Sequence, residues 1–127
     1  MTGNQRPVKT FRELDAWKKA HGLTLTVYRA SSGFPADERF GLVMQLRRAA
    51  SSVPANIAEG FARRTTKDFL RHLDIASGSL EETRYFLLLG NDLGYIASQN
   101  HEEIQRACDE VGRLLGGLMQ ALRRRLT

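Results

Sequence analysis

The sequence is poor in the residues that constrain a chain covalently. Among its 127 residues there is one cysteine, Cys108, so an internal disulfide is excluded. There are only three prolines, which leaves room for long helices. No run approaches the roughly 18 apolar residues of a membrane span, and the polar first 14 residues lack the apolar stretch of a signal peptide. We therefore expect a cytoplasmic protein that does not associate with a membrane.

Groups that could carry catalysis or bind a metal are also scarce. His21, His72 and His101 fall on different predicted helices, and none has a second ligand at metal-binding spacing on the same face. Cys108 lies beside an apolar stripe and is interpreted as a packing residue. The serines of ASGSLEE, residues 76–82, lack the strand-to-helix turn of a nucleophile elbow. We expect no metal, no cofactor and no enzymatic activity.

The composition is that of a folded, basic domain. Hydrophobic residues make up 42% and charged residues 26% of the chain, and the formal net charge is +5. A basic excess attracts polyanions by long-range attraction and counterion release, so it favours RNA or DNA as a partner. The alternative interpretation is a solvated surface with a slight basic excess.

Hydrophobic periodicity predicts four helices joined by short connections. We expect them from about Arg12 to Ser31, from near Asp37 to about Phe61, from Thr65 or Thr66 into the sequence GNDLGYI, and from Ser98–His101 to about Arg125. The fold class is therefore all-α, an antiparallel up-down-up-down four-helix bundle. Residues 1–9 show no periodicity and are predicted to form a flexible arm, which leaves residues 10–127 as a single domain.

Each predicted helix carries an apolar stripe that should face the core. In the first helix the expected stripe is Leu14, Trp17, His21, Leu25 and Tyr28. In the second it is Leu42, Leu46, Ala49, Val53, Ile57 and Phe61. In the third it is Phe69, Leu73, Ala76, Leu80, Thr83 and Leu87. In the fourth it is Ile104, Ala107, Val111, Leu114, Leu118 and Ala121, with Arg125 as a candidate last member and Leu115 and Leu122 widening it. Pro54 interrupts the second helix and removes the hydrogen bond to the carbonyl of Ala50, so we expect a kink there.

Polar residues form a row beside the stripe of the second helix. Ser52, Asn56, Glu59 and Arg63 are spaced by three or four residues, so neighbouring side chains in the row can meet on one helical face. Beside a buried stripe such groups must satisfy one another. We interpret Ser52, Pro54, Asn56 and Glu59 as a structural polar network, or as a contact between subunits, that fixes helix partner and register. The alternative is a polar pocket.

Cationic residues cluster in two places. Arg63, Arg64, Lys67 and Arg71 surround the turn between the second and third helices, and Arg47 and Arg48 come several turns earlier. Both groups are candidates for contacts to nucleic-acid phosphates. No aromatic residue alternates with these charges at the spacing of a single-strand binding surface, although two phenylalanines lie nearby. Sequence-specific reading of bases has no support.

Several stretches resemble a known family. They are FRELDAWKKAHGL, VYRASSGFPADERFGLVMQLRRAASSVPANIAEGFARR, DFLRHLDIASGSLEETRYFL and DLGYI. Together these are similar to the four-helix-bundle proteins of the 23S rRNA intervening-sequence family, and the likeness runs from about Phe11 to Leu122. The residues that match the central motif are Arg47, Arg48, Ser52, Pro54, Asn56, Glu59 and Gly60. Departures from the family pattern occur at Ala62, Ser77 and residues 83–85.

The resemblance implies a bacterial protein whose bundles assemble into a ring of five subunits. The bundle is also similar to the accessory variability protein of diversity-generating retroelements, a basic pentameric barrel that binds nucleic acid and a reverse transcriptase. By this analogy of fold and charge, a homopentamer with nucleic acid as its partner is expected here.

Two functions follow from these observations as competing hypotheses. The first is a non-enzymatic homo-oligomeric bundle that binds RNA or DNA through its basic surface. The second is a scaffold that docks a protein partner, with incidental basic charge. An enzyme acting in a pocket around Asn56 and Glu59 is disfavoured, because no activated acid, base or metal site can be assembled from the sequence.

Overall fold

The computed structural model describes residues 7–126. It contains four α-helices, α1 (Asp15–Ser31), α2 (Leu42–Phe61), α3 (Thr66–Asp92) and α4 (Ser98–Arg124), and no strand within the described residues. The all-helical fold class is confirmed. Of the predicted arm, residues 1–6 lie outside the described range, and residues 7–9 are exposed and lack regular structure.

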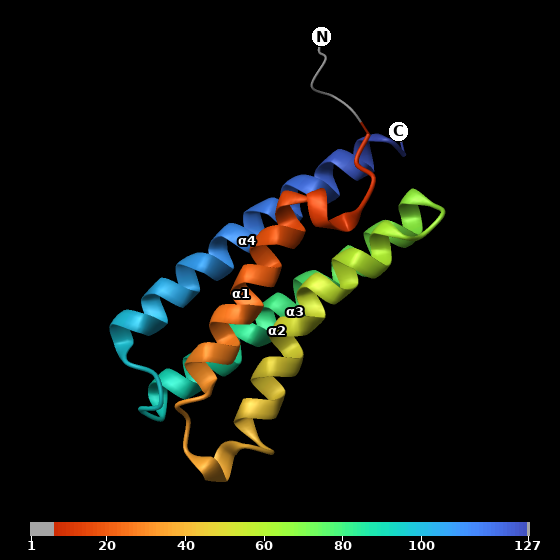
Figure 1. The fold of residues 1–127 in the computed structure, drawn as a ribbon. Helices are drawn as coiled ribbons and strands as arrows, with labels where there is room; N and C mark the ends of the chain where they lie inside the picture. Colours follow the sequence, from red (N-terminus) through yellow and green to blue (C-terminus); the bar gives the residue numbers. More distant parts are fainter. Residues whose placement is uncertain (1–6, 127) are drawn as a thin grey trace.

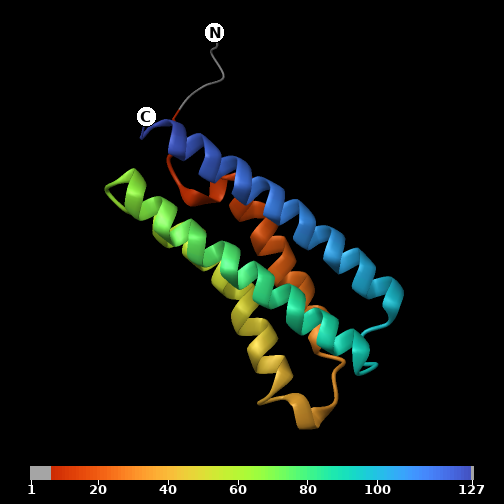
Figure 2. The ribbon, with the colours of Figure 1, turned by 180° about the vertical axis from the view of Figure 1, so that it is seen from behind.

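The four helices pack side by side around one core (Figures 1 and 2). The start of α1, the α2–α3 turn and the end of α4 lie at one end of the molecule, and the α1–α2 and α3–α4 connections lie at the other. Each of α2 and α4 packs against both α1 and α3. Fully buried leucine and isoleucine side chains such as Leu46, Ile57, Leu73, Leu87 and Leu115 fill the space between them. This burial supplies the main stabilising free energy of the fold.

Two predicted helix starts were wrong, and in both cases a short 3-10 turn precedes the helix. α1 begins at Asp15 rather than Arg12, because the turn η1 (Phe11–Glu13) is held separately by the Glu13 carboxylate, which accepts the N–H of Thr10 at 3.2 Å. α2 begins at Leu42 rather than near Asp37, after the turn η2 (Ala36–Glu38). Glu38 still reaches the helix start, since its carboxylate accepts the Leu42 N–H at 3.3 Å.

The predicted stripes of α2 and α3 face the core, but the stripe predicted for α1 does so only at its start, where Leu14 and Trp17 pack against the core. The buried residues of α1 are Ala16, Ala20, Leu23, Thr24, Val27 and Ser31. The expected Leu25 and Tyr28 are 41% and 43% exposed. α1 carries apolar residues on two faces, and the face with small alanines is the one that packs against its neighbours. In α4 the buried row is shifted from the predicted one and contains Ile104, Cys108, Val111, Leu115, Met119 and Leu122.

Pro54 lies within α2 without ending it. The residue has no N–H, so the carbonyl of Ala50 loses its helical partner. The hydroxyl of Thr24, on α1, shares its single proton between that carbonyl at 3.1 Å and the carbonyl of Ala20 at 2.9 Å, in a buried position. The acceptor freed by the proline is thus used to join α1 to α2.

Candidate nucleic-acid interface

Part of the predicted polar row forms a network between α2 and α3. Asn56 donates through Nδ2 to the carbonyl and hydroxyl of Ser52, at 2.9 and 3.0 Å. Its Oδ1 lies 3.3 Å from Nδ1 of His72, and the hydroxyls of Ser52 and Ser79 are 2.8 Å apart. The network therefore joins two helices of one chain, and among the described residues no buried side-chain nitrogen or oxygen lacks a partner.

The other two members of the predicted network lie outside this hydrogen-bonded group. Glu59 is exposed and forms an ion pair with Arg63, at 3.2 Å between Oε2 and Nη2. Pro54 is buried in the apolar face of α2. The partners contributed by α3, His72 and Ser79, were missed because no pattern in the sequence says which residues of α3 stand opposite Asn56.

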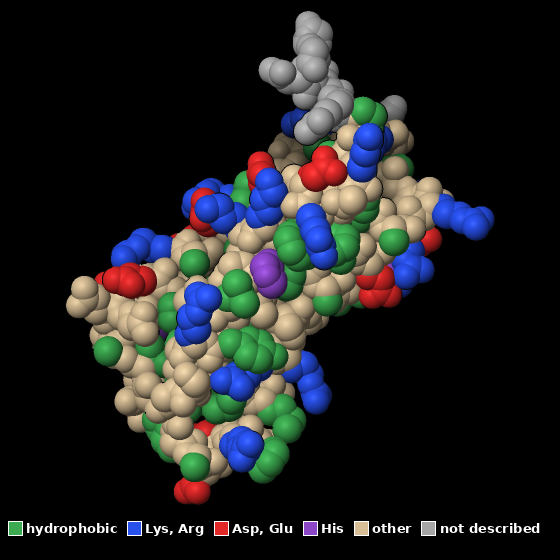
Figure 3. Space-filling view, in the orientation of Figure 1, with side chains coloured by type: hydrophobic (Ala, Val, Ile, Leu, Met, Phe, Trp, Pro, Cys, Tyr) green, Lys and Arg blue, Asp and Glu red, His purple; other side chains and the backbone are tan. Residues whose placement is uncertain are grey.

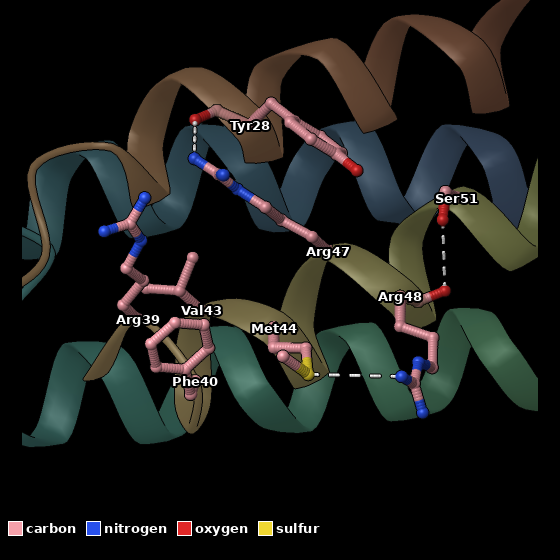
Figure 4. A pocket seen from close by; sticks show the side chains of 8 residues that line it. All are labelled: Tyr28, Arg39, Phe40, Val43, Met44, Arg47, Arg48 and Ser51. Carbon is pink, nitrogen blue, oxygen red and sulfur yellow. Dashed lines mark hydrogen bonds between the residues drawn. The ribbon is translucent and has the colours of Figure 1, made fainter. Parts of the chain in front are cut away.

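Arg47 is committed to holding α2 against the end of α1. Its Nε donates to Ser31 Oγ at 2.8 Å and its Nη2 donates to the carbonyl of Tyr28 at 3.1 Å. The guanidinium also lies 4.6 Å from the centre of the Tyr28 ring (Figure 4). Two of its five N–H groups are thus used within the protein, and the guanidinium is held against α1.

A shallow hollow of about 490 Å³ lies beside Arg47 on the outer face of α1 and α2. Phe40, Met44 and Arg48 contribute to its lining, and Arg48 points away from α1 (Figure 4). Phe40 is 78% exposed. Arg48 is exposed, and its contact within the protein is a long one to the Met44 sulfur at 4.0 Å.

The second cationic group lies at the opposite end of α2. Arg71 is 3.8 Å from Asp68, and Arg63 is paired with Glu59 as described above. Arg64 and Lys67 are exposed and form no ion pair with any described residue. The 16 residues from Arg47 to Arg63 correspond to about 24 Å along a helix, so the two predicted groups do not form one site.

The α2–α3 turn is shaped by a close contact at Gly60. A Cβ at this position would lie 2.8 Å from Cβ of His72 and 2.9 Å from Cδ1 of Phe69. Glycine therefore allows α3 to approach α2 closely, which brings Phe69 and Phe61 into edge-to-face contact with ring centres 6.1 Å apart. Thr65 caps α3 by accepting the N–H of Asp68 at 3.1 Å.

The end of α4 completes this site with a residue that sequence reasoning did not assign to it. A hollow of about 220 Å³ is lined by Arg63, Arg64, Thr65, Phe61 and Phe69 from the turn region, together with Leu122 and Arg125 from the end of α4. Arg125 follows the last turn of α4, where a cation also interacts favourably with the helix dipole. Its place beside Arg64 depends on how α4 packs against α3.

Cys108 and Arg84, two further groups that could carry chemistry, are both held in contacts within the protein. Burial raises the pKa of the Cys108 thiol from 9.0 to about 11, so it is protonated at neutral pH and a poor nucleophile. Burial acts to lower the pKa of Arg84, but its hydrogen bond to Asp109 and the charge of Glu81 raise it overall. Within residues 7–126, no group of three histidine, cysteine or acidic side chains is placed to hold a metal.

No helix in the described part of the chain is both long enough and apolar enough to cross a membrane.

The fold and its surface define a basic, all-helical bundle protein. Over residues 12–117 the chain matches the 23S rRNA-intervening sequence proteins, and it belongs to that family. It is also similar to a crystal structure of a protein of unknown function from the S23 ribosomal protein family of Bacteroides thetaiotaomicron. The two share 24% identity with a TM-score of 0.77, over 83% of this chain and 95% of the other, which supports the fold. No curated protein matches the chain.

Proposed function

We propose that this protein is a non-enzymatic, cytoplasmic homopentamer of up-down-up-down bundles that binds RNA or DNA through its basic surface. The observation that carries the proposal is the gathering of Arg64 and Arg125 around one hollow, with Lys67 on the adjoining first turn of α3. Within the described residues none of the three forms an ion pair. Exposed cations without acidic partners are free to neutralise phosphates and release their counterions.

The binding mode that follows is one of backbone contacts. Arginine and lysine contacts to phosphates fix the position of a nucleic acid without reading its sequence. We therefore expect affinity that falls steeply with salt and depends little on sequence.

The ring is supported by two separate exposed apolar surfaces. One lies on α1 and α2 and includes Leu25, Tyr28, Phe40 and Met44. Hydrophobic and basic side chains are interspersed over the face of the molecule that carries α1 and the start of α2 (Figure 3). The other lies on α3, where Tyr85 and Leu88, three residues apart, are both exposed. A closed ring of identical subunits needs two different complementary faces on each chain.

A scaffold for a protein partner is the second candidate. The hollow beside Arg47 combines Tyr28, Phe40, Met44 and Arg48, and aromatic residues, methionine and arginine are enriched at protein interfaces. A stoichiometric protein partner that stays bound after nuclease treatment, together with no RNA affinity at low salt, would favour this function over the first.

Filter binding to a structured RNA, measured from low to physiological salt, tests the first function. We expect the variant Arg64→Ala/Lys67→Ala/Arg125→Ala to lose at least about 10-fold in affinity and to lower the salt slope by about 2, because the three cations proposed to contact phosphates are removed. A matched control is Arg29→Ala/Arg106→Ala/Arg113→Ala, which removes the same charge from exposed positions on α1 and α4.

The control variant should bind with nearly the affinity of the unmodified protein. If the protein shows no affinity at low salt, or if both variants bind equally well, the proposed function fails.

A further inference from the structure

The hollow at the end of the bundle has an aromatic floor and a cationic rim. Phe61 and Phe69 meet edge to face at an interplanar angle of 86°, so the two rings present surfaces of different orientation. Both rings are only partly buried, and Leu122 extends the apolar surface beside them. Every nucleobase has a flat apolar face that stacks on such rings, whatever its identity.

The rim offers several donors for a phosphate. Arg64 and Arg125 come from different elements and are both exposed without an ion pair among the described residues. The hollow also adjoins the first turn of α3, whose dipole favours an anion; there the N–H of Asp68 is taken by Thr65, and those of Thr66 and Lys67 have no partner within the helix. The nearby acids Glu59 and Asp68 are each paired, with Arg63 and Arg71, so they oppose an incoming phosphate less.

The volume of the hollow and the side chains that line it restrict what can enter it. At about 220 Å³ it is a small site that suits one nucleotide rather than a helix. In a duplex the base faces are covered by stacking on neighbouring pairs, so the floor cannot reach them without unstacking. In a loop or single strand, an unpaired base can turn out and stack on an aromatic side chain while its phosphate remains on the rim.

We propose that this hollow holds one unpaired nucleotide of a single-stranded RNA or DNA, with the base on Phe61 and Phe69 and its phosphate on Arg64 and Arg125. The inference rests on the nucleic-acid binding proposed above and adds to it the location of the site and the preferred form of the strand. It also gives a role to Phe61, Phe69 and Arg125, which charge alone does not suggest.

Fluorescence anisotropy with a labelled 12-nucleotide RNA, its DNA equivalent and the corresponding duplex tests the proposal on the full-length protein. We expect the single strands to bind at least about 5-fold more tightly than the duplex. Arg64→Ala and Arg125→Ala should each weaken single-strand binding by about 3- to 10-fold and lower the salt slope by about 0.7. Arg106→Ala is the matched control, since it is exposed on α4 at about 28 Å along the helix from Arg125.

Phe61→Leu tests the floor without removing charge. It should weaken single-strand binding by about 5-fold or more, leave duplex binding and the salt slope unchanged, and be restored by Phe61→Trp, which keeps a ring for stacking. Thermal unfolding by circular dichroism identifies any variant whose loss comes from unfolding. Free adenosine monophosphate should displace the labelled strand only at a concentration at least about 100-fold above the Kd of the strand.

Three results would overturn the inference while leaving nucleic-acid binding intact. They are equal affinity for single strand and duplex, unchanged single-strand binding by folded Phe61→Leu, and an equal loss on Arg106→Ala and Arg125→Ala. Displacement by the free nucleotide at the concentration of the strand would assign the hollow to a mononucleotide instead. Absence of binding to every nucleic acid at low salt would show that the proposed function itself fails.

Discussion

At the scale of single residues, a hydrogen bond that is lost within one helix is replaced by a donor from a neighbouring helix. Pro54 leaves the carbonyl of Ala50 without a helical donor, and the hydroxyl of Thr24 supplies one at 3.1 Å from α1. An unpaired buried carbonyl costs about 1–3 kcal/mol, and this contact offsets part of that cost. A residue that disrupts one helix locally thereby fixes the position of its neighbour.

Thr24→Val should lower the free energy of unfolding by about 1–3 kcal/mol, because the side chain keeps its shape and loses only the donor. In the background Pro54→Ala the same change should cost distinctly less, since the new N–H at position 54 can bond the Ala50 carbonyl. Urea denaturation of the four proteins gives the coupling energy of the cycle.

Thr26→Val is a matched control on α1, since Thr26 is only partly buried and forms no hydrogen bond through its side chain within the described residues. We expect it to change stability by less than about 0.5 kcal/mol. An equal cost of Thr24→Val in both proline backgrounds would show that the Thr24 hydroxyl does not serve the carbonyl freed by Pro54.

At the scale of the elements, the approach of α3 to α2 depends on Gly60. Its neighbours, His72 and Phe69, also support the Asn56 network and the aromatic floor of the hollow. The glycine costs helix propensity in α2, and the close packing of the two helices compensates for that cost. The site at the α2–α3 turn is therefore built by the same contact that joins the helices.

Gly60→Ala should destabilise the protein by about 1–3 kcal/mol although alanine is the better helix former, because the added methyl would overlap Phe69 and His72. Gly117→Ala, on α4, has no heavy atom within 4 Å of the added Cβ and should stabilise the chain by about 0.5–1 kcal/mol. Thermal and urea unfolding of both variants measures the contrast. A stabilising Gly60→Ala would contradict the close approach.

At the scale of the whole molecule, several large apolar side chains lie on the surface of a single chain and take no part in its core. Phe40, Tyr28 and Met44 on one side and Tyr85 and Leu88 on α3 are all at least 40% exposed. In a ring these surfaces would meet, and the basic ends of the subunits would gather on one rim. Several weak phosphate contacts brought together in this way bind a long strand more tightly than any one alone.

Light scattering should give a mass near five times the 14.3 kDa of one chain. Phe40→Glu should reduce the mass to that of a monomer while leaving the helical circular dichroism signal unchanged, because this side chain is 78% exposed and contributes little to the core. Gln120→Glu adds the same charge at an exposed position on α4 and should keep the ring. A monomeric unmodified protein would contradict the ring, and a pentameric Phe40→Glu would place its interface elsewhere.

Some elements of this fold were predictable from the sequence, and others were not. The stripes of α2 and α3 were predicted correctly, because these two helices have one dominant apolar face. α1 has two apolar faces, and periodicity favoured the one with larger residues, of which Leu25 and Tyr28 proved to be exposed. Only the part of the candidate site at the α2–α3 turn was predictable from the sequence. Arg63, Arg64 and Lys67 are neighbours in the chain, whereas Arg125 is 61 residues beyond Arg64 and reaches the hollow only through packing.

The sequence by itself determined the local features of this protein, namely four helices, the positions of their turns and a surplus of positive charge. These features depend on contacts between residues that are a few positions apart in the sequence, and such contacts recur with the regular period of a helix. Only the tertiary structure decided which face of α1 is buried, which residues of α3 complete the Asn56 network, and that Arg125 stands beside Arg64. Those outcomes depend on how the surfaces of separate helices fit together, which is a property of the packed molecule and is absent from any local pattern.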